Sequence, residues 1–85
     1  MDKSQLARAA VDKAAQEGHD IRQEDAEQLI DALFGTVGMA GVIAEALKRG
    51  ETVVAGSFGR FHTDEGSAAF QPGKALTEYL RGSTP

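Results

Sequence analysis

The sequence predicts an α+β domain with two N-terminal helices, a three-stranded antiparallel sheet with a shortened hairpin, and a short C-terminal helix. Three observations predict it. Apolar residues recur at helical spacing through the first half of the chain. Short β-branched and aromatic runs lie between glycines at residues 51–70, and a proline–glycine pair at 72–73 precedes a last apolar-periodic stretch. The 85 residues suit a single domain, with a helical half at about 2–49 and a sheet and terminal helix at about 51–81.

The first helix is expected from a capping box at the N-terminus. The side chain of Asp2 can accept a hydrogen bond from the amide of Gln5, whose own side chain can bond back to residue 2. The helix that opens there is expected to run to about Glu17, where a glycine follows. We expect Asp20 to cap the second helix, with Gln23 at the reciprocal position.

The second helix carries an apolar seam whose members follow one another in alternating steps of four and three residues, a heptad-like spacing. Two cations and a glycine at residues 48–50 are a C-terminal signature, so we favour one long helix that ends there. Gly35, Gly38 and Gly41 lie inside it, each costing about 1 kcal/mol relative to alanine. The alternative is a break near residues 35–41 that leaves two shorter helices. The seam consists of Ala26, Ile30, Leu33, Val37, Ala40, Ala44 and Leu47.

The central part of this seam predicts self-association. Residues 32–44 are uncharged on every side, which is typical of a helix buried on several faces. The chain is small and rich in alanine, which buries little apolar area, so we expect a homodimer to complete the core. Glycines in the helix would let a neighbouring backbone approach closely. The expected interface residues are Ile30, Leu33, Phe34, Val37, Ala40, Ala44 and Leu47.

The sheet is expected from β-rich runs after the second helix. Residues 51–55 and 60–63 predict two strands, and Gly56 and Gly59 permit a bend between them.

The remaining elements follow a short polar connection. Residues 64–67 have the composition of a turn, and residues 68–70 can form the third strand. The final helix is expected from about residue 74 to 80, and residues 81–85 are expected to form a frayed tail.

Two segments of the C-terminal half resemble the HU/IHF family of bacterial histone-like DNA-binding proteins. They are residues 56–61 (Gly-Ser-Phe-Gly-Arg-Phe) and residues 69–76 (Ala-Phe-Gln-Pro-Gly-Lys-Ala-Leu), and shorter helical fragments keep the family's order along the chain. The resemblance implies an intertwined dimer whose helices and sheets form a saddle, with DNA on the sheet face between two long β-arms. Only residues 62–69 occupy the place of such an arm here, so this chain resembles an atypical, arm-less member.

The resemblance also implies a partner and its contacts. The partner is double-stranded DNA, bound without sequence preference. The implied contacts are Arg60 on the second strand, Gly73 and Lys74 at the last helix, and Ser57 beside the bend. A lysine and free backbone amides at a helix start suit a phosphate. Without arms there is no wedge between base pairs and there are few phosphate contacts, so binding is expected to be weak.

Charge opposes strong nucleic-acid binding. The net charge is −4, with nine acidic and four basic side chains in residues 1–47 and four acidic and five basic in residues 48–85. DNA would therefore bind the C-terminal half. The alternative is an arm-less dimeric interaction or scaffold module that has another protein as its partner and no longer binds DNA. Asp64 and Glu65, where the arm would begin, favour that alternative.

Other function classes are not expected. His19 and His62 are isolated in sequence, and no serine, histidine and acid arrangement is recognisable, so we expect no enzyme, no metal site and no cofactor. The absence of cysteine excludes a thiolate site and fits a reducing cytoplasm. The longest uncharged run is too short for a bilayer, which takes about 20 residues. Residues 1–5 lack the apolar core of a signal peptide, so the expected location is the bacterial cytoplasm, at the nucleoid if DNA is bound.

Overall fold

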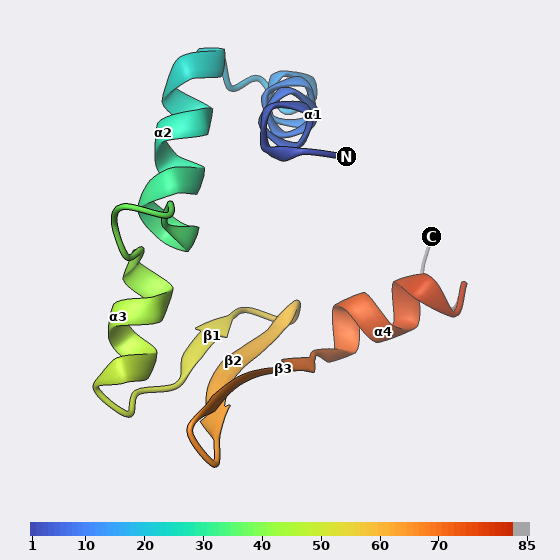
Figure 1. The fold of residues 1–85 in the computed structure, drawn as a ribbon. Coiled ribbons are helices and arrows are strands. Elements are labelled where there is room, and N and C mark those ends of the chain that lie inside the picture. The colour runs from blue at the N-terminus through green and yellow to red at the C-terminus, as the bar shows by residue number, and fades with distance from the viewer. Residues whose placement is uncertain (83–85) are drawn as a thin grey trace. The chain divides into compact units, whose positions relative to one another are not determined.

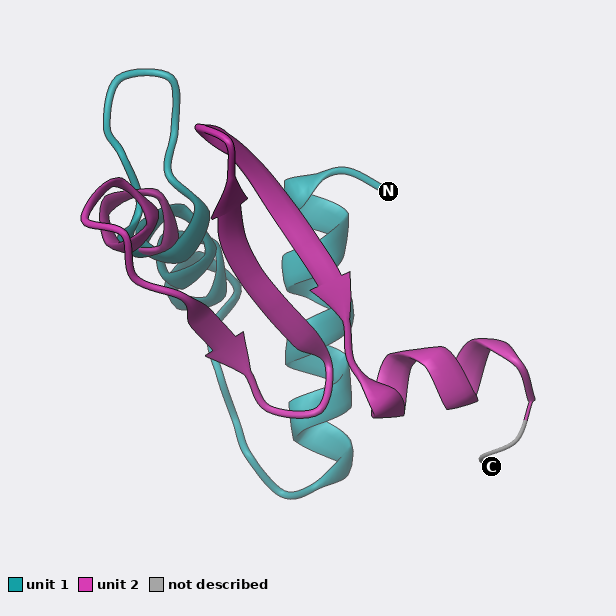
Figure 2. Ribbon diagram, turned by 90° about the horizontal axis from the view of Figure 1, so that it is seen from below, with its two compact units in different colours: residues 1–42 teal, residues 43–85 magenta. Residues whose placement is uncertain are grey.

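The computed structural model describes residues 1–82, and residues 83–85, which complete the predicted tail, lie outside the described residues. Three helices, a three-stranded sheet and a fourth helix follow one another along the described chain (Figure 1). It divides into two compact units, residues 1–42 and residues 43–82, here called the N-terminal and the C-terminal unit (Figure 2). The helices in residues 1–82 are all too short or too polar to cross a membrane.

Helix α1 (Lys3–Gln16) begins at the predicted capping box. The Gln5 amide donates to Asp2 Oδ1 at 2.9 Å, and the Asp2 amide donates to Gln5 Oε1 at 2.8 Å. The helix ends at a C-cap on Glu17, as predicted, and Gly18 turns the chain with a φ of 87°. The sequence therefore predicted both ends of this helix correctly.

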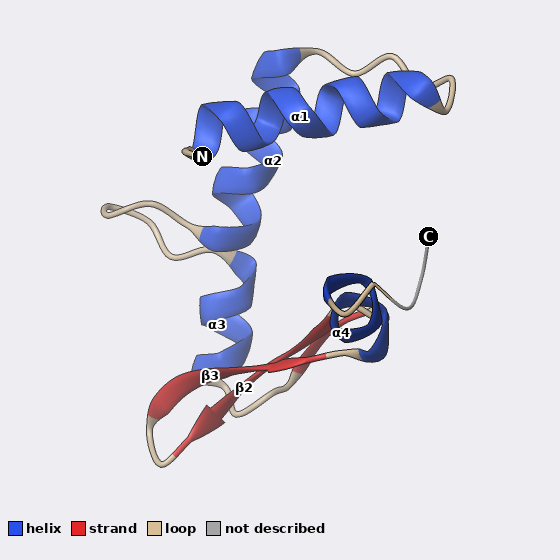
Figure 3. Cartoon of the chain, turned by 90° about the vertical axis from the view of Figure 1, so that its right-hand side faces the viewer, coloured by secondary structure: helices blue, strands red, loops and turns tan. Residues whose placement is uncertain are grey.

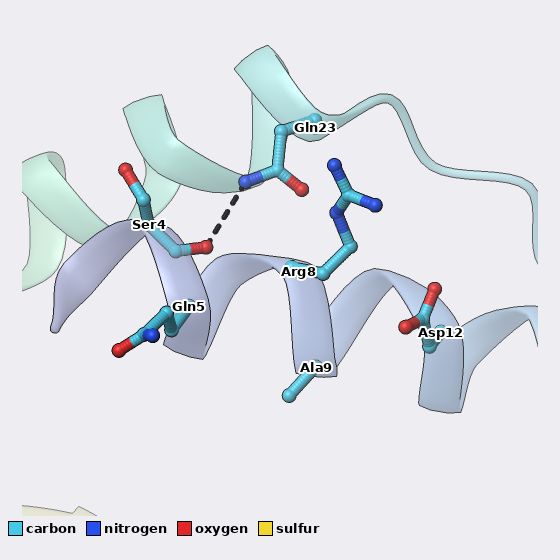
Figure 4. A pocket seen from close by; sticks show the side chains of 6 residues that line it. All are labelled: Ser4, Gln5, Arg8, Ala9, Asp12 and Gln23. Carbon is cyan, nitrogen blue, oxygen red and sulfur yellow. Dashed lines mark hydrogen bonds between the residues drawn. The ribbon is translucent and has the colours of Figure 1, made fainter. Parts of the chain in front are cut away.

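Helix α2 (Gln23–Phe34) begins later than its predicted cap requires. Its N-cap is Arg22, which makes no side-chain capping bond, so the prediction of an Asp20 cap is wrong. The side-chain amide of Gln23 donates to the Ser4 carbonyl at 3.1 Å and to Glu27 at 3.0 Å. Figure 4 shows this reach from α2 to α1. The side chain of Gln23 therefore links the two helices and does not cap the start of α2.

The contact between α1 and α2 organises the N-terminal unit. Ala7 is fully buried, and Lys3 Nζ on α1 lies 2.6 Å from Asp31 Oδ1 on α2. The hydrogen bond raises the pKa of Lys3. An apolar groove of about 240 Å³ follows the two helices, with Val11 on one side and Leu29 and Leu33 on the other.

The favoured long helix is wrong, and the alternative break is confirmed. Helix α2 ends at Phe34, helix α3 (Val42–Lys48) begins eight residues later, and residues 35–41 form a loop (Figure 3). Three helices, not two, therefore precede the sheet in the described chain. Gly35 ends α2 with a φ of 84°, a left-handed conformation in which a glycine is favoured.

The loop is closed at both its tip and its neck. Thr36 and Met39 exchange backbone hydrogen bonds of 2.8 and 3.2 Å across the tip. At the neck, a Cβ built on the buried Gly41 would overlap the backbone of Leu33, Phe34 and Gly35. Glycine at residue 41 is therefore required for the chain to return to the end of α2.

The C-terminal unit contains an antiparallel sheet in the order β1-β2-β3, which confirms the three predicted strands. The strands are β1 (Val53–Ala55), β2 (Gly59–Asp64) and β3 (Ser67–Pro72). Glu65 and Gly66 close the β2–β3 hairpin with φ values of 51° and 84°, both positive as a type I′ turn requires. The hairpin is thus short and tightly turned. Helix α4 (Lys74–Leu80) follows over the residues predicted for it.

Few apolar side chains are covered by the rest of the chain. Among residues 1–82, the buried hydrophobic side chains are Ala7 and Ala46, at 0% and 6% exposure, and no large side chain is fully buried. Phe34, Phe58 and Tyr79 are all more than half exposed. Burial of apolar area is the main stabilising term in folding. Within residues 1–82, one copy of the chain therefore lacks most of the apolar core that would stabilise it.

Candidate nucleic-acid interface

Arg60 lies on the face of the sheet opposite its aromatic residues. It is paired with Gln71 across the β2–β3 ladder, and its Nε donates to Gln71 Oε1 at 2.7 Å. Val54 stands opposite Arg60 on β1, and His62 lies two residues further along β2, on the same face. The bond from Nε fixes the guanidinium plane, and within residues 1–82 the two terminal nitrogens make no hydrogen bond. Such a group can bind an oxyanion bidentately.

The opposite face of the sheet carries an aromatic cluster. The rings of Phe58 and Phe61 lie 5.5 and 5.0 Å from the ring of Phe70, both tilted by about 45°. Phe58 is 52% exposed and Phe70 is 38% exposed, so the cluster has one side without cover in the described chain. The sheet therefore separates a polar face from an apolar one.

Gly73 and Ser57 are brought together, but as packing partners. The Gly73 amide donates to the Phe58 carbonyl at 2.8 Å, and the Ala75 amide donates to the Ser57 carbonyl at 3.1 Å. A Cβ on Gly73 would overlap the Ser57 carbonyl. The expectation of free amides at this helix start is therefore wrong for residues 73 and 75, because the strand bend at residues 57–59 already uses them.

Lys74 is available to solvent. Its side chain is 85% exposed, and its Nζ lies 3.9 Å from Glu78 Oε2, at the outer limit of an ion pair. Such an exposed pair contributes little and is screened by salt. Lys74 thus remains able to meet a phosphate.

A shallow pocket of about 220 Å³ connects two of the predicted positions. Arg60 and Gly73 both line it, together with Gln71 and Pro72. Ser57 and Lys74 do not line it, although each is adjacent to Gly73 in contact or in sequence. The four predicted positions therefore occupy one region, around the junction of β3 and α4. A larger hollow beside Arg8 and Asp12, seen in Figure 4, lies in the other unit and includes none of them.

Gln71 is the site residue that sequence reasoning missed. Its role depends on the strand register, which pairs it with Arg60 across the ladder. Polar residues at both positions, next to Phe61 and Phe70, are a signal that could have suggested the pair, since opposite residues of antiparallel strands share a face.

Another cation of the C-terminal unit, Arg49, is paired with a carboxylate. Arg49 Nε lies 2.9 Å from Glu51 Oε2, and this hydrogen bond and the charge of Arg49 lower the pKa of Glu51. Asp64 and Glu65 place two carboxylates at the hairpin end. The region around Arg60 is therefore a small basic spot, not a basic stripe.

The predicted dimer residues are divided among three elements. Ile30, Leu33 and Phe34 lie on α2, Ala44 and Leu47 on α3, and Val37 and Ala40 in the loop between them. Leu33 is 38% exposed and Val37 is fully exposed in the described chain.

Solved structures similar to this chain cover nearly its whole length. HU from Thermotoga maritima is 30% identical with a TM-score of 0.71, covering 94% of this chain and 98% of that one. A single-residue variant of the same HU is 28% identical with a TM-score of 0.74, covering 94% and 99%. No family model and no curated protein sequence matches. The identity and the coverage of both chains show that this protein belongs to the HU/IHF family of histone-like proteins.

Proposed function

We propose that this protein is a homodimeric, non-enzymatic DNA-binding protein of the HU/IHF type, which binds double-stranded DNA weakly and without sequence preference. The observation that carries the proposal is the exposed basic spot formed by Arg60 and Lys74 at the β3–α4 junction, in a chain of this family. A bacterial cytoplasmic location at the nucleoid fits that role.

The uncovered apolar surface supports the homodimer. The groove between α1 and α2 and the aromatic cluster of the sheet both present large apolar side chains to solvent. A soluble monomer rarely exposes large apolar patches. A second copy offers the same groove and the same cluster, so a symmetric pair of contacts can cover both and close the assembly.

The binding mode follows from the two cations. Gln71 holds the guanidinium of Arg60 in place, so little side-chain entropy is lost when a phosphate binds. Lys74 adds a mobile positive charge one residue beyond the pocket. Contacts of this kind go to the DNA backbone and do not distinguish bases.

Weak binding follows from what the short hairpin lacks. A tight two-residue turn at residues 65–66 leaves no extension to enter a groove of the duplex. The carboxylates of Asp64 and Glu65 repel phosphates near that turn. Two cations on each copy give a dimer about four phosphate contacts, which is fewer than tight DNA-binding proteins make.

A titration with short duplex DNA tests the proposal. At about 50 mM salt, the NMR resonances of Arg60 and Lys74 should shift, while those of Lys13 on α1 should not. Unchanged resonances at both sites up to a large excess of duplex would contradict DNA binding.

A second candidate function is an arm-less dimeric module whose partner is another protein. The net charge of −4 and the acidic hairpin turn favour it. A stable dimer whose resonances do not shift when duplex DNA is added would support this candidate function and exclude the first.

A further inference from the structure

The apolar seam of the sequence continues through a loop that is not helical. Its heptad-like steps run from Leu33 to Val37, Ala40 and Ala44 without interruption. In the structure Val37 and Ala40 lie in the loop, between the end of α2 and the start of α3. A segment that is always a loop does not need helical spacing of its apolar residues. The spacing therefore indicates that this segment can also form a helix.

The loop length preserves the phase of the helix. Residues 35–41 number seven, and seven residues make nearly two turns at 3.6 residues per turn. If these residues became helical, Val37 and Ala40 would join Leu33 and Ala44 on one continuous apolar face. No charged residue lies between residues 32 and 44 to oppose burial of that face.

The looped state has identifiable supports and costs. The Thr36–Met39 bonds and the closed neck at Gly41 hold it, while Val37 and Met39 remain exposed to solvent, Met39 at 74%. The helical state would satisfy the backbone groups of the loop by regular bonds, but three glycines oppose it, since glycine is a poor helix former. Backbone hydrogen bonds therefore stabilise both states, while exposed apolar side chains oppose the loop and glycines oppose the helix.

We propose that residues 35–41 are a two-state segment: a closed loop in one state, and in the other a helix that joins α2 and α3 into one rod. The conversion would move Gly41 from beside the end of α2 to about 10 Å beyond it, at 1.5 Å per residue. A partner that covers the seam favours the helical state, because only there does Val37 lie beside Leu33. The inference does not depend on DNA binding.

Two glycine substitutions test the proposal because they act differently on the loop. Gly41→Ala places a Cβ where the closed neck has the backbone of Leu33, and it also improves helix propensity. Gly38→Ala improves helix propensity alone, since a Cβ there meets nothing within 4 Å. The readouts are the backbone chemical shifts of residues 36–40 and the far-ultraviolet circular dichroism of the full chain.

The expected results are distinct. Gly41→Ala should move residues 36–40 to helical chemical shifts and increase the helical signal of the chain. Gly38→Ala should move them part of the way, or show exchange between two sets of shifts. The proposal is overturned if Gly38→Ala leaves loop shifts without exchange and Gly41→Ala loses structure without any gain of helix. Because Gly38→Ala does not disturb the neck, its result is informative even if Gly41→Ala fails to fold.

Discussion

Replacing Gly73 by alanine tests the packing on which the candidate interface depends. The added Cβ would overlap the Ser57 carbonyl, so the bend at residues 57–59 must move away from the start of α4. That movement breaks the bond from the Gly73 amide to Phe58 and the bond from the Ala75 amide to Ser57. At about 1 kcal/mol for each hydrogen bond, with some strain added, the cost is about 2–3 kcal/mol of unfolding free energy.

Thermal unfolding followed by circular dichroism measures this cost. For a domain of this size, the loss corresponds to a fall in Tm of about 10–20 °C. Both proteins must be compared at one concentration, because the Tm of a dimer depends on it. Lys74→Ala is the matched control: it changes the adjacent, 85% exposed side chain and should alter stability by no more than about 0.5 kcal/mol.

A Gly73→Ala variant with the same Tm as the parent protein would refute the reasoning, since the bend could then not be packed against this residue. The expected result also separates two roles of the family motif. Gly73 is needed for packing, so a loss of DNA binding in Gly73→Ala reports a displaced bend, whereas a loss in Lys74→Ala with normal melting reports a lost contact.

Two further predictions concern association and charge. Leu33→Asp should weaken the homodimer by at least about 2 kcal/mol, because the seam would bury a carboxylate, and light scattering should show a fall from twice the 9.0 kDa chain mass toward the monomer. Gln28→Asp, at an exposed position of α2, is the control, and an unchanged mass for Leu33→Asp would argue against the seam. Arg49→Ala should raise the pKa of Glu51 toward its ordinary 4.5, as measured by an NMR titration of the carboxyl group. Because the pKa of Glu51 is lowered in the folded protein, the pair stabilises the fold above the ordinary pKa of Glu51. That stabilisation is lost as pH falls through the lowered pKa. A Glu51 pKa that is the same in Arg49→Ala and in the parent protein would exclude the ion pair in solution.

Local signals predicted most of the fold. The Asp2 capping box, the glycines around the bend and the limits of α4 are encoded within a few residues each, and the structure confirms them. The central helix could not be predicted in the same way. Its seven-residue loop keeps the apolar period, so periodicity alone does not distinguish a loop from two turns of helix. The decisive fact is the close approach of Gly41 to Leu33, a contact between positions eight residues apart.

The sequence predicted where the residues of the candidate site lie better than it predicted what each of them contacts. Arg60 and Lys74 were found from the motif, and both are exposed in the structure. The hydrogen bond between Arg60 and Gln71 depends on strand register, and the use of the Gly73 amide depends on where the bend packs. Both are tertiary facts that composition and spacing do not contain.

A duplex-binding assay over a salt series tests the central claim most directly. Two copies that each contribute Arg60 and Lys74 neutralise about four phosphates, so log K should fall with log salt at a slope of about −3 to −4. Between about 50 and 200 mM salt, affinity should fall about a hundredfold. The Arg60→Ala, Lys74→Ala double variant should lose this dependence, and Lys13→Ala should keep it. Binding that ignores salt, or a double variant with the parent slope, would contradict the account.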